Sequence, residues 1–455
     1  MDHPDRCFGA LTAAAAGVVG QDIKVFGAYP SDIDSTNGIV NNWAIDQTNF
    51  VAQSTAVPML DAAIAPNGNV GYVYFYQEPG TAGPNSHLYY GIRGGASVLN
   101  PVFGEKIVSN AIGGTGAFMN GLHPSLAYDS SSNPAIAFLD QGLAANARYL
   151  MVARSSNGGV SFDLDRVDGS AANTKNVGQY TSISVTSQDT IGVAYYDFSA
   201  GGTTGQRLKF AKREKNGAWL RYVVDGPGST GSGCNPAVSS TTGLYANFKW
   251  ISAGKPVIVY QGVSSGIKSL KLAYAQEAQS SLTYTWTCLT IDTDSQGFNV
   301  RGEGIDFYLT SADLPYIAHY DSGVGALRVV TCPSGGDVIT CAVTGATAFS
   351  GERLNYLVGT VTSIASRPGI VVDSTGKITV SFHSAGDMGI FIASKSAGTS
   401  GGWSATDEAI ETSPLNVGST YTGHHGVLLL NSGSQPMLFF RGFENWIKYY
   451  SREPD

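Results

Sequence analysis

Seven segments of the chain share one pattern, and this repeat limits the fold more than any other feature. Each segment spans eighteen residues without a gap: an apolar run, a turn of Asp, Ser, Asn, Gly or Pro, and a second apolar run ending in aromatic or acidic residues. The segments begin at Leu60, His123, Tyr180, Leu244, Gly304, Arg367 and His425. Two β-rich runs around a short turn indicate a hairpin, and its near-regular recurrence indicates stacked copies of one supersecondary unit.

Two further alternating runs follow most hairpins. After the second hairpin, for example, they are Arg148 to Arg154 and Val160 to Val167. Four antiparallel strands per repeat make one blade of a β-propeller. We therefore expect an all-β fold over residues 1–455, a single domain built as a seven-bladed β-propeller of four-stranded antiparallel blades.

The last repeat ends at Asp455, shortly after its third strand, so its fourth strand has to come from elsewhere. We expect the N-terminal segment, residues 1–56, to supply it, with Asp22 to Tyr29 or Ile39 to Ile45 as the candidate strand. An N-terminal strand in this place closes the ring and leaves no open sheet edge. A linear solenoid is the alternative, but it requires polar capping units, and the final repeat is as apolar as the others.

Charge and hydropathy exclude several classes of partner. A net charge of -8 leaves no basic footprint for nucleic acid or for an anionic membrane surface. No apolar run approaches the length of a membrane span. The low charged fraction of 14% favours a secreted, periplasmic or cell-surface protein. Because the apolar stretch Leu11 to Gly20 follows no positively charged segment, we expect a mature chain that lacks its signal peptide.

Five cysteines are consistent with an oxidising compartment. Cys332 and Cys341 flank a turn and can form a cross-strand disulfide if they face the same side, the alternative being two buried thiols. The sequence leaves the pairing of Cys7, Cys234 and Cys288 open.

Propeller geometry predicts where a ligand binds. The first strand of each hairpin starts, and the second ends, at one face of the ring, here called the upper face, whose loops are free to vary over rigid blades. The candidate ligand-binding residues at these positions are His123, Asp140, Tyr180, Asp197, Asp321, Arg367, His383, His425 and Arg441. Tyrosines for stacking beside carboxylates, arginines and imidazoles predict a site for a glycan or a protein. The carboxylates have a second interpretation, because an Asp at a strand end often caps backbone amides.

One loop has the spacing of a calcium-binding loop. Asp292, Asp294, Gln296 and Glu303 fall at positions 1, 3, 5 and 12, and Gly297 at position 6 allows the sharp turn. Gln at position 5 and Val300 at position 9 depart from the usual pattern, and the flanks are predicted strands. Calcium is the only cofactor that the sequence indicates.

The fragment Ser155 to Phe162 (SSNGGVSF) resembles the Asp-box of sialidase-like propellers, a structural turn between the third and fourth strands of a blade. Asn157 replaces the characteristic Asp, and no other blade has a convincing copy. The resemblance implies a turn and no activity. If it extended to a retaining sialidase, it would imply an arginine triad, a Tyr nucleophile and an acid, and the residues available for these roles are Asp140, Tyr421, Arg301, Arg367 and Arg441.

The sequence favours a ligand-binding propeller, adhesin-like or lectin-like, over an enzyme. A sialidase-like glycoside hydrolase or a polysaccharide-cleaving propeller is one alternative, and a structural scaffold of a surface assembly is another. The three functions differ in what they require: paired carboxylates across a pocket, a shallower rim, or an apolar flank. The fold alone does not choose among them, because propellers support all three.

Overall fold

The computed structural model describes part of the chain, and every structural statement below refers to that part. The described residues are 26–28, 32–33, 40–41, 43–47, 60–77, 86–93, 104–110, 120–141, 148–169, 177–198, 206–234, 241–264, 266–292, 301–321, 325–354, 367–384, 389–396, 403, 408–412, 424–441 and 447–452.

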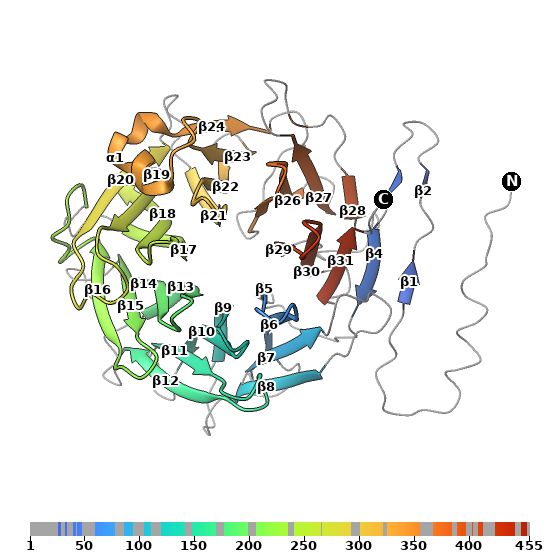
Figure 1. Cartoon of the computed structure of the whole chain (residues 1–455), viewed down its shortest axis with the longest axis horizontal. Helices are drawn as coiled ribbons and strands as arrows, with labels where there is room; N and C mark the ends of the chain where they lie inside the picture. Colours follow the sequence, from blue (N-terminus) through green and yellow to red (C-terminus); the bar gives the residue numbers. More distant parts are fainter. Residues whose placement is uncertain are drawn as a thin grey trace, which may run out of the picture.

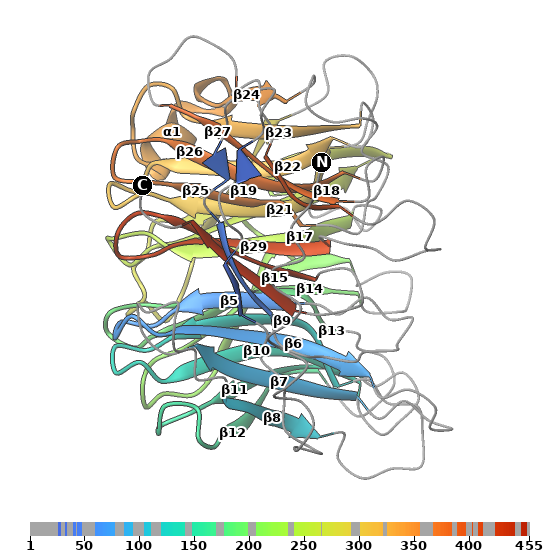
Figure 2. The ribbon, with the colours of Figure 1, turned by 90° about the vertical axis from the view of Figure 1, so that its right-hand side faces the viewer.

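Six four-stranded antiparallel sheets follow one another around a ring (Figure 1), and we call them blades 1 to 6 in chain order. Blades 1 to 3 consist of β5 (Leu60–Ile64), β6 (Val70–Gln77), β7 (Ser86–Arg93) and β8 (Gly104–Asn110); β9 (Asn120–Tyr128), β10 (Pro134–Gln141), β11 (Arg148–Arg154) and β12 (Asp163–Asp168); and β13 (Val177–Val185), β14 (Ile191–Asp197), β15 (Arg207–Arg213) and β16 (Leu220–Asp225). Blades 4 to 6 consist of β17 (Thr241–Trp250), β18 (Pro256–Ser264), β19 (Ile267–Ala275) and β20 (Trp286–Asp292); β21 (Arg301–Leu309), β22 (Pro315–Asp321), β23 (Ala326–Thr331) and β24 (Ser350–Arg353); and β25 (Gly369–Val372), β26 (Ile378–Ser384), β27 (Gly389–Lys395) and β28 (Glu408–Thr412). The first strand of each blade lies nearest the ring axis, and the strands run between the two faces (Figure 2).

A further sheet joins the two ends of the chain. Its five strands are, in order, β1 (Phe26–Ala28), β4 (Trp43–Gln47), β31 (Ile447–Arg452), β30 (Pro436–Arg441) and β29 (His424–Leu430). The pairing of β4 with β31 is antiparallel. The β-propeller is confirmed, whereas the expectation of seven four-stranded blades is wrong in its count: six sheets have four strands, and the closing sheet gains a fifth because the N-terminal segment adds two strands. A separate two-stranded ladder pairs β2 (Asp32–Ile33) with β3 (Val40–Asn41).

A short helix stands where the sequence predicts a strand. The β-branched run from Val338 to Val343 follows the third strand of blade 5 and has the residue types of a fourth strand, but it forms α1 (Val338–Thr344), followed by η2 (Ala346–Ala348). The Asp337 side chain caps this helix by accepting a hydrogen bond from the Thr340 amide at 2.7 Å. Local capping therefore outweighs β propensity, and β24 takes the place of the fourth strand. No helix in the described part is long and apolar enough to cross a membrane.

The first strands of neighbouring blades are joined by side chains that accept hydrogen bonds from backbone amides. The Asp61 carboxylate of blade 1 accepts from the Leu126 amide of blade 2 at 2.8 Å. The hydroxyls of Ser125 and Ser182 accept in the same way from the Ile183 amide at 3.0 Å and the Phe248 amide at 2.9 Å. Each bond satisfies a buried amide of the next blade, so these polar side chains fix the spacing of the blades around the axis.

A second set of contacts joins the turns on the lower face, opposite the upper face. The Asp189 carboxylate of blade 3 accepts from the Ser130 amide of blade 2 at 2.8 Å, and the Asp313 carboxylate of blade 5 accepts from the Ser252 amide of blade 4 at 3.1 Å. Asp189 and Asp313 have φ values of 63° and 59°, a conformation that Asp tolerates better than most residues.

A third set lies where the fourth strands end, near the upper face. Between blades 2 and 3, the Asp168 carboxylate of blade 2 accepts a hydrogen bond from the Tyr195 hydroxyl of blade 3 at 2.8 Å. It also pairs with the Lys209 ammonium of blade 3. Asp225, Tyr260 and Lys271 repeat this arrangement between blades 3 and 4. Between blades 4 and 5, Asp292, His319 and Arg328 take the three places. A buried carboxylate with two donors from the next blade thus recurs at three successive interfaces.

Aromatic side chains fill the space between blades. Phe210 of blade 3 lies edge-on to Phe248 of blade 4, with ring centroids 5.2 Å apart. Tyr72 of blade 1 stacks on Phe439 of the closing sheet at 6.0 Å. Such rings bury large apolar areas and explain why the second strands are hydrophobic on both faces.

Two disulfides are present. Cys332 and Cys341 are bonded as the sequence predicts, although Cys341 lies on α1 rather than on a strand. Cys234 and Cys288 are also bonded, which links the connection after β16 to β20. Cys7 lies outside the described residues.

We expect Asp225→Ala to lower the free energy of unfolding by roughly 3 to 5 kcal/mol, because it leaves the buried Lys271 ammonium and the Tyr260 hydroxyl without their partner. Lys215→Ala, which breaks the ion pair of a side chain that is 65% exposed, is the control and should leave the free energy of unfolding nearly unchanged. Urea unfolding of both variants measures the difference, and equal losses would contradict a structural role for the buried carboxylates.

Candidate functional site

Three equivalent residues on the first strands of blades 2 to 4 place their rings side by side. His123, Tyr180 and Tyr245 have φ values of 51°, 51° and 52°. Each follows a glycine by two residues, and the strand pairing shifts register at each of these places. This β-bulge turns the residue away from the regular strand pattern. The sequence alignment placed Leu244 in this column, one residue too early.

These residues form what we call the aromatic wall: His123, Tyr180 and Tyr245. The centroid of the Tyr180 ring lies 4.8 Å from that of His123 and 4.8 Å from that of Tyr245. All three side chains are half-buried. A continuous set of partly exposed ring faces suits a ligand that has both apolar and polar surfaces.

Four charged residues from four blades meet at the ring axis, and we call them the axis cluster: Asp61, Lys249, Asp306 and Arg367. The Arg367 guanidinium lies 2.9 Å from an Asp306 oxygen and 3.4 Å from an Asp61 oxygen. Asp61 belongs to β5 and Asp306 to β21, so one guanidinium connects the first strands of blades 1 and 5. The Arg367 side chain is 30% exposed and can be reached by a ligand.

Asp306 is the most connected member of the axis cluster. Besides Arg367, it accepts a hydrogen bond from the Asn247 amide group at 3.0 Å and one from the Ile370 backbone amide at 3.0 Å. Three donors around one carboxylate hold its oxygens in a fixed orientation.

Burial and charge act differently on the members of the axis cluster. Burial raises the pKa of the Asp61 carboxyl above its usual range, against the opposing effect of Arg367. Burial lowers the pKa of the Lys249 ammonium. Burial alone would lower the pKa of Arg367, but Asp306 and Asp61 outweigh it and raise the pKa. Asp61 is therefore a carboxyl group that holds its proton more readily than a solvated Asp.

The other sequence-predicted residues are spread over the upper face. Burial raises the pKa of Asp140, at the end of β10, with Arg166 opposing. Asp197 is 1% exposed and accepts a hydrogen bond from Arg207 at 3.1 Å. Asp321 is 2% exposed, and one of its oxygens lies 3.9 Å from Arg353. These last two carboxylates lie beside arginines of their own blades.

Several predicted residues have no described side chain. Tyr421, Asp294 and Gln296 lie outside the described residues. Only the backbone is described for Arg301, Glu303, His425 and Arg441. The calcium loop and the full arginine triad therefore stay predictions.

Asp292, the first residue of the predicted calcium loop, has partners within the protein. Its carboxylate accepts from Arg328 at 2.8 Å and lies 3.2 Å from a His319 nitrogen. Burial would raise the pKa of Asp292, but His319 and Arg328 hold it well below its usual range. The negative charge of Asp292 is thus paired with the Arg328 guanidinium and the His319 ring of blade 5.

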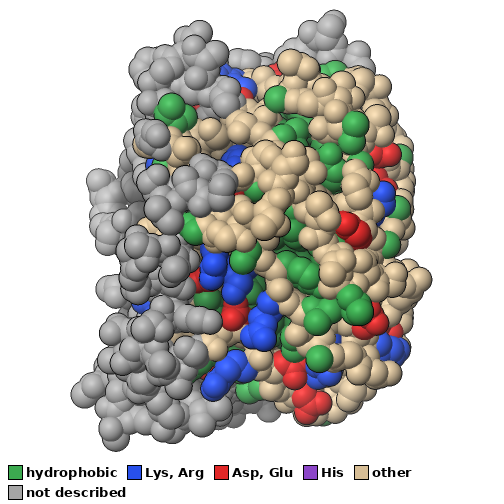
Figure 3. Space-filling view, turned by 90° about the vertical axis from the view of Figure 1, so that its left-hand side faces the viewer, with side chains coloured by type: hydrophobic (Ala, Val, Ile, Leu, Met, Phe, Trp, Pro, Cys, Tyr) green, Lys and Arg blue, Asp and Glu red, His purple; other side chains and the backbone are tan. Residues whose placement is uncertain are grey.

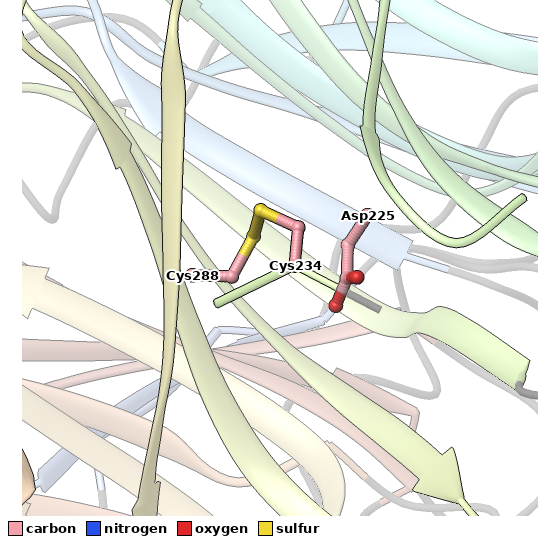
Figure 4. A group of neighbouring side chains, drawn as sticks. All are labelled: Asp225, Cys234 and Cys288. Carbon is pink, nitrogen blue, oxygen red and sulfur yellow. A yellow bond between two sulfur atoms is a disulfide. The ribbon is translucent and has the colours of Figure 1, made fainter. Parts of the chain in front are cut away.

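One other group has ligand atoms close enough for a metal ion among the described residues. Asp225, Cys234 and Cys288 offer atoms that all lie within 4.8 Å of one another (Figure 4). The two sulfurs are joined in a disulfide and carry no thiolate to bind a metal. Asp225 is moreover paired with Lys271.

Comparison with known proteins gives a likeness of fold. No family model matches the chain, and no curated protein matches it. Similar solved structures include the Hadza microbial sialidase Hz136, with 13% identity over 82% of this chain and 74% of that one (TM-score 0.49). Others are an α-L-arabinanase of Penicillium chrysogenum, with 14% identity over 94% and 96% (TM-score 0.46), and the NanB sialidase of Streptococcus pneumoniae, with 11% over 92% and 72% (TM-score 0.45). Sialidases are thus among the similar structures, at the low identity that the weak Asp-box resemblance suggests.

Sequence reasoning found Arg367, His123 and Tyr180, but it missed Asp61, Lys249, Asp306 and Tyr245. A signal for the missed carboxylates was available: Asp61 and Asp306 are acidic residues inside apolar runs, where Ser125 and Ser182 stand in other blades. Charged residues inside an apolar strand are seldom buried unless they are paired, so such an Asp indicates a specific contact.

His383 provides a pH test of the upper face. It is 2% exposed, and burial lowers its pKa from 6.5 to about 4. Between these values the unfolded chain binds a proton that the folded chain does not, so stability falls as pH drops from about 6.5 to about 4. We expect His383→Gln to remove roughly 3 kcal/mol of this pH-dependent loss, measured as the free energy of unfolding at pH 7 and pH 4. An unchanged pH profile in the variant would contradict a neutral, buried imidazole.

Proposed function

We propose that this protein is a carbohydrate-active β-propeller that cleaves a glycosidic bond at the upper end of its axis. One observation carries the proposal: Arg367 holds two carboxyl groups from different blades, Asp61 and Asp306. These carboxyls bond to Leu126 and Asn247, which lie on the same strands as His123 and Tyr245 of the aromatic wall. Most glycoside hydrolases use a pair of carboxyl groups on either side of the scissile bond.

The two carboxyl groups suit different roles. Asp61, whose pKa is raised by burial, is the candidate general acid that protonates the leaving oxygen. Asp306 accepts three hydrogen bonds and is the candidate carboxylate that acts as base or nucleophile. Since one guanidinium contacts both groups, the contacted oxygens lie no more than roughly 9 Å apart, a range that includes the separations of retaining and inverting enzymes. Arg367 would exchange one of these contacts for an oxygen of the substrate.

The aromatic wall supports a saccharide as the substrate. The C–H faces of a sugar ring stack on aromatic side chains, and its hydroxyls bond to nearby carboxylates and guanidinium groups. Of the residues that the sequence offers for a hydrolase, Arg367 belongs to the axis cluster. Asp140 lies at the upper face, near the end of β10. We further propose that residues 1–455 form one domain and that the two disulfides reflect an exported protein.

A lectin-like or adhesin-like module is the second candidate. The observation that favours it is the pairing of Arg367 with both carboxylates, which neutralises the two groups that a hydrolase needs. Such a module would bind a glycan or a protein at the aromatic wall without turnover. A scaffold role would use the flank of the ring and would require an apolar surface there. On the flank shown in Figure 3, positively and negatively charged side chains lie beside one another.

The test assays the purified protein on fluorogenic glycosides, including sialosides and arabinofuranosides, with a glycan array in parallel. We expect turnover that falls at least 100-fold in Asp61→Asn and Asp306→Asn, while glycan binding persists. Asp163→Asn, on the exposed part of β12, is the matched control and should keep full activity.

Each outcome has a definite meaning. Binding that is lost in Tyr180→Ala, without turnover of any substrate, would replace the hydrolase with the binding module. Turnover that survives both Asp variants would place the catalytic carboxyls elsewhere. Circular dichroism of each variant shows that its fold is retained.

A further inference from the structure

A cavity lies on the lower face, away from the axis cluster. It has a volume of about 280 Å³ and lies between blades 2 and 3, and Val185 and Ile191 form part of its wall. The cationic side chains of Arg154, Arg213 and Lys215 also line it. None of the residues in the axis cluster or the aromatic wall contributes to this cavity.

One carboxylate outside the lining orients two of the cations. Asp165 accepts a hydrogen bond from the Nε of Arg154 at 2.7 Å and also one from Arg213. The Trp219 indole donates to the same oxygen at 3.2 Å. The Arg213 Nε is in turn bonded to the Gly217 carbonyl at 2.8 Å. Both guanidinium groups are therefore fixed before a ligand arrives, which lowers the entropy cost of binding.

The donors and acceptors of this cavity are unequally used. Asp129 accepts from the Ser131 and Asn133 amides and from the Asn133 side chain, and Asp189 accepts from the Ser130 amide and from Lys215. In contrast, no hydrogen bond within the described residues involves the two terminal nitrogens of Arg154, and the Lys215 ammonium uses one of its three donors.

This imbalance determines the kind of ligand. The formal charges of the lining residues cancel, three cations against Asp129, Asp189 and Glu214, so the net charge does not select a ligand. The donors that the protein leaves unused offer a criterion instead, because a ligand with acceptor oxygens can replace the water at these N–H groups. Planar guanidinium groups match the paired oxygens of a carboxylate or sulfate. We propose that the cavity between blades 2 and 3 binds an oxyanion, a carboxylate or sulfate group carried by a saccharide.

The test titrates sodium sulfate, glucuronate and, as the uncharged control, glucose into the full chain, followed by calorimetry. A decisive variant is Ser156→Glu, because Ser156 is an exposed residue of the lining and its replacement adds a negative charge without touching the Asp165 network. Ser280→Glu adds the same charge at an exposed lower-face position outside the cavity and is the matched control. Arg154→Gln removes unused donors directly.

We expect glucuronate and sulfate to bind, glucose not to bind, and both Ser156→Glu and Arg154→Gln to weaken binding at least tenfold while Ser280→Glu does not. Tighter binding of glucuronate than of sulfate supports a saccharide-borne group, and the reverse order overturns that source in favour of a free ion. Equal binding of glucose, or affinity unchanged in Ser156→Glu, overturns the proposal. Asp61→Asn should bind both anions normally, so failure at the axis and failure here are distinguishable.

Discussion

The ring depends on hydrogen bonds that cross from one blade to the next. Each first strand has backbone amides that face the neighbouring blade rather than a partner strand. Asp61, Ser125, Ser182 and Asp306 satisfy such amides, and losing one would leave a buried donor unpaired. Two of these residues, Asp61 and Asp306, also belong to the axis cluster. The same side chains that hold the blades together thus provide the charges at the candidate active site.

This double use explains the position of the site. The axis is the one place where first strands from distant parts of the sequence approach each other, so side chains from blades 1, 4, 5 and 6 meet there. Arg367 pairs with Asp61, which lies 306 residues earlier in the chain, and with Asp306, which lies 61 residues earlier. Burial at the axis raises the pKa of Asp61, while in the lower-face cavity Asp165 orients the guanidinium groups of Arg154 and Arg213. The axis cluster and the lower-face cavity are thus two separate charged environments on one scaffold, and they are where we propose proton transfer and anion binding.

The sequence predicts the propeller well because the repeat is local. A hairpin period reports strands, turns and their order, and it also predicts that an N-terminal strand completes the last sheet. It does not fix the register to the residue: the same bulge occurs at His123, Tyr180 and Tyr245, but the alignment began the repeat of blade 4 one residue too early, so Tyr245 was missed. The helix α1 was missed because a single capping residue, Asp337, decides the conformation of a β-branched run. The axis cluster was missed because its members lie far apart in the chain and only the closed ring brings them together.

The closing sheet has a mechanical consequence. Trp43, at the start of β4, pairs with Arg452, at the end of β31, so the two ends of the ring leave the sheet at the same edge. A force that separates these ends loads the hydrogen bonds of the β4–β31 pair one after another, as in a zipper, rather than all together in shear. Because β1 is also paired with β4, tension on the N-terminal segment loads the β1–β4 hydrogen bonds before it reaches the β4–β31 pair, and the six four-stranded blades are loaded last.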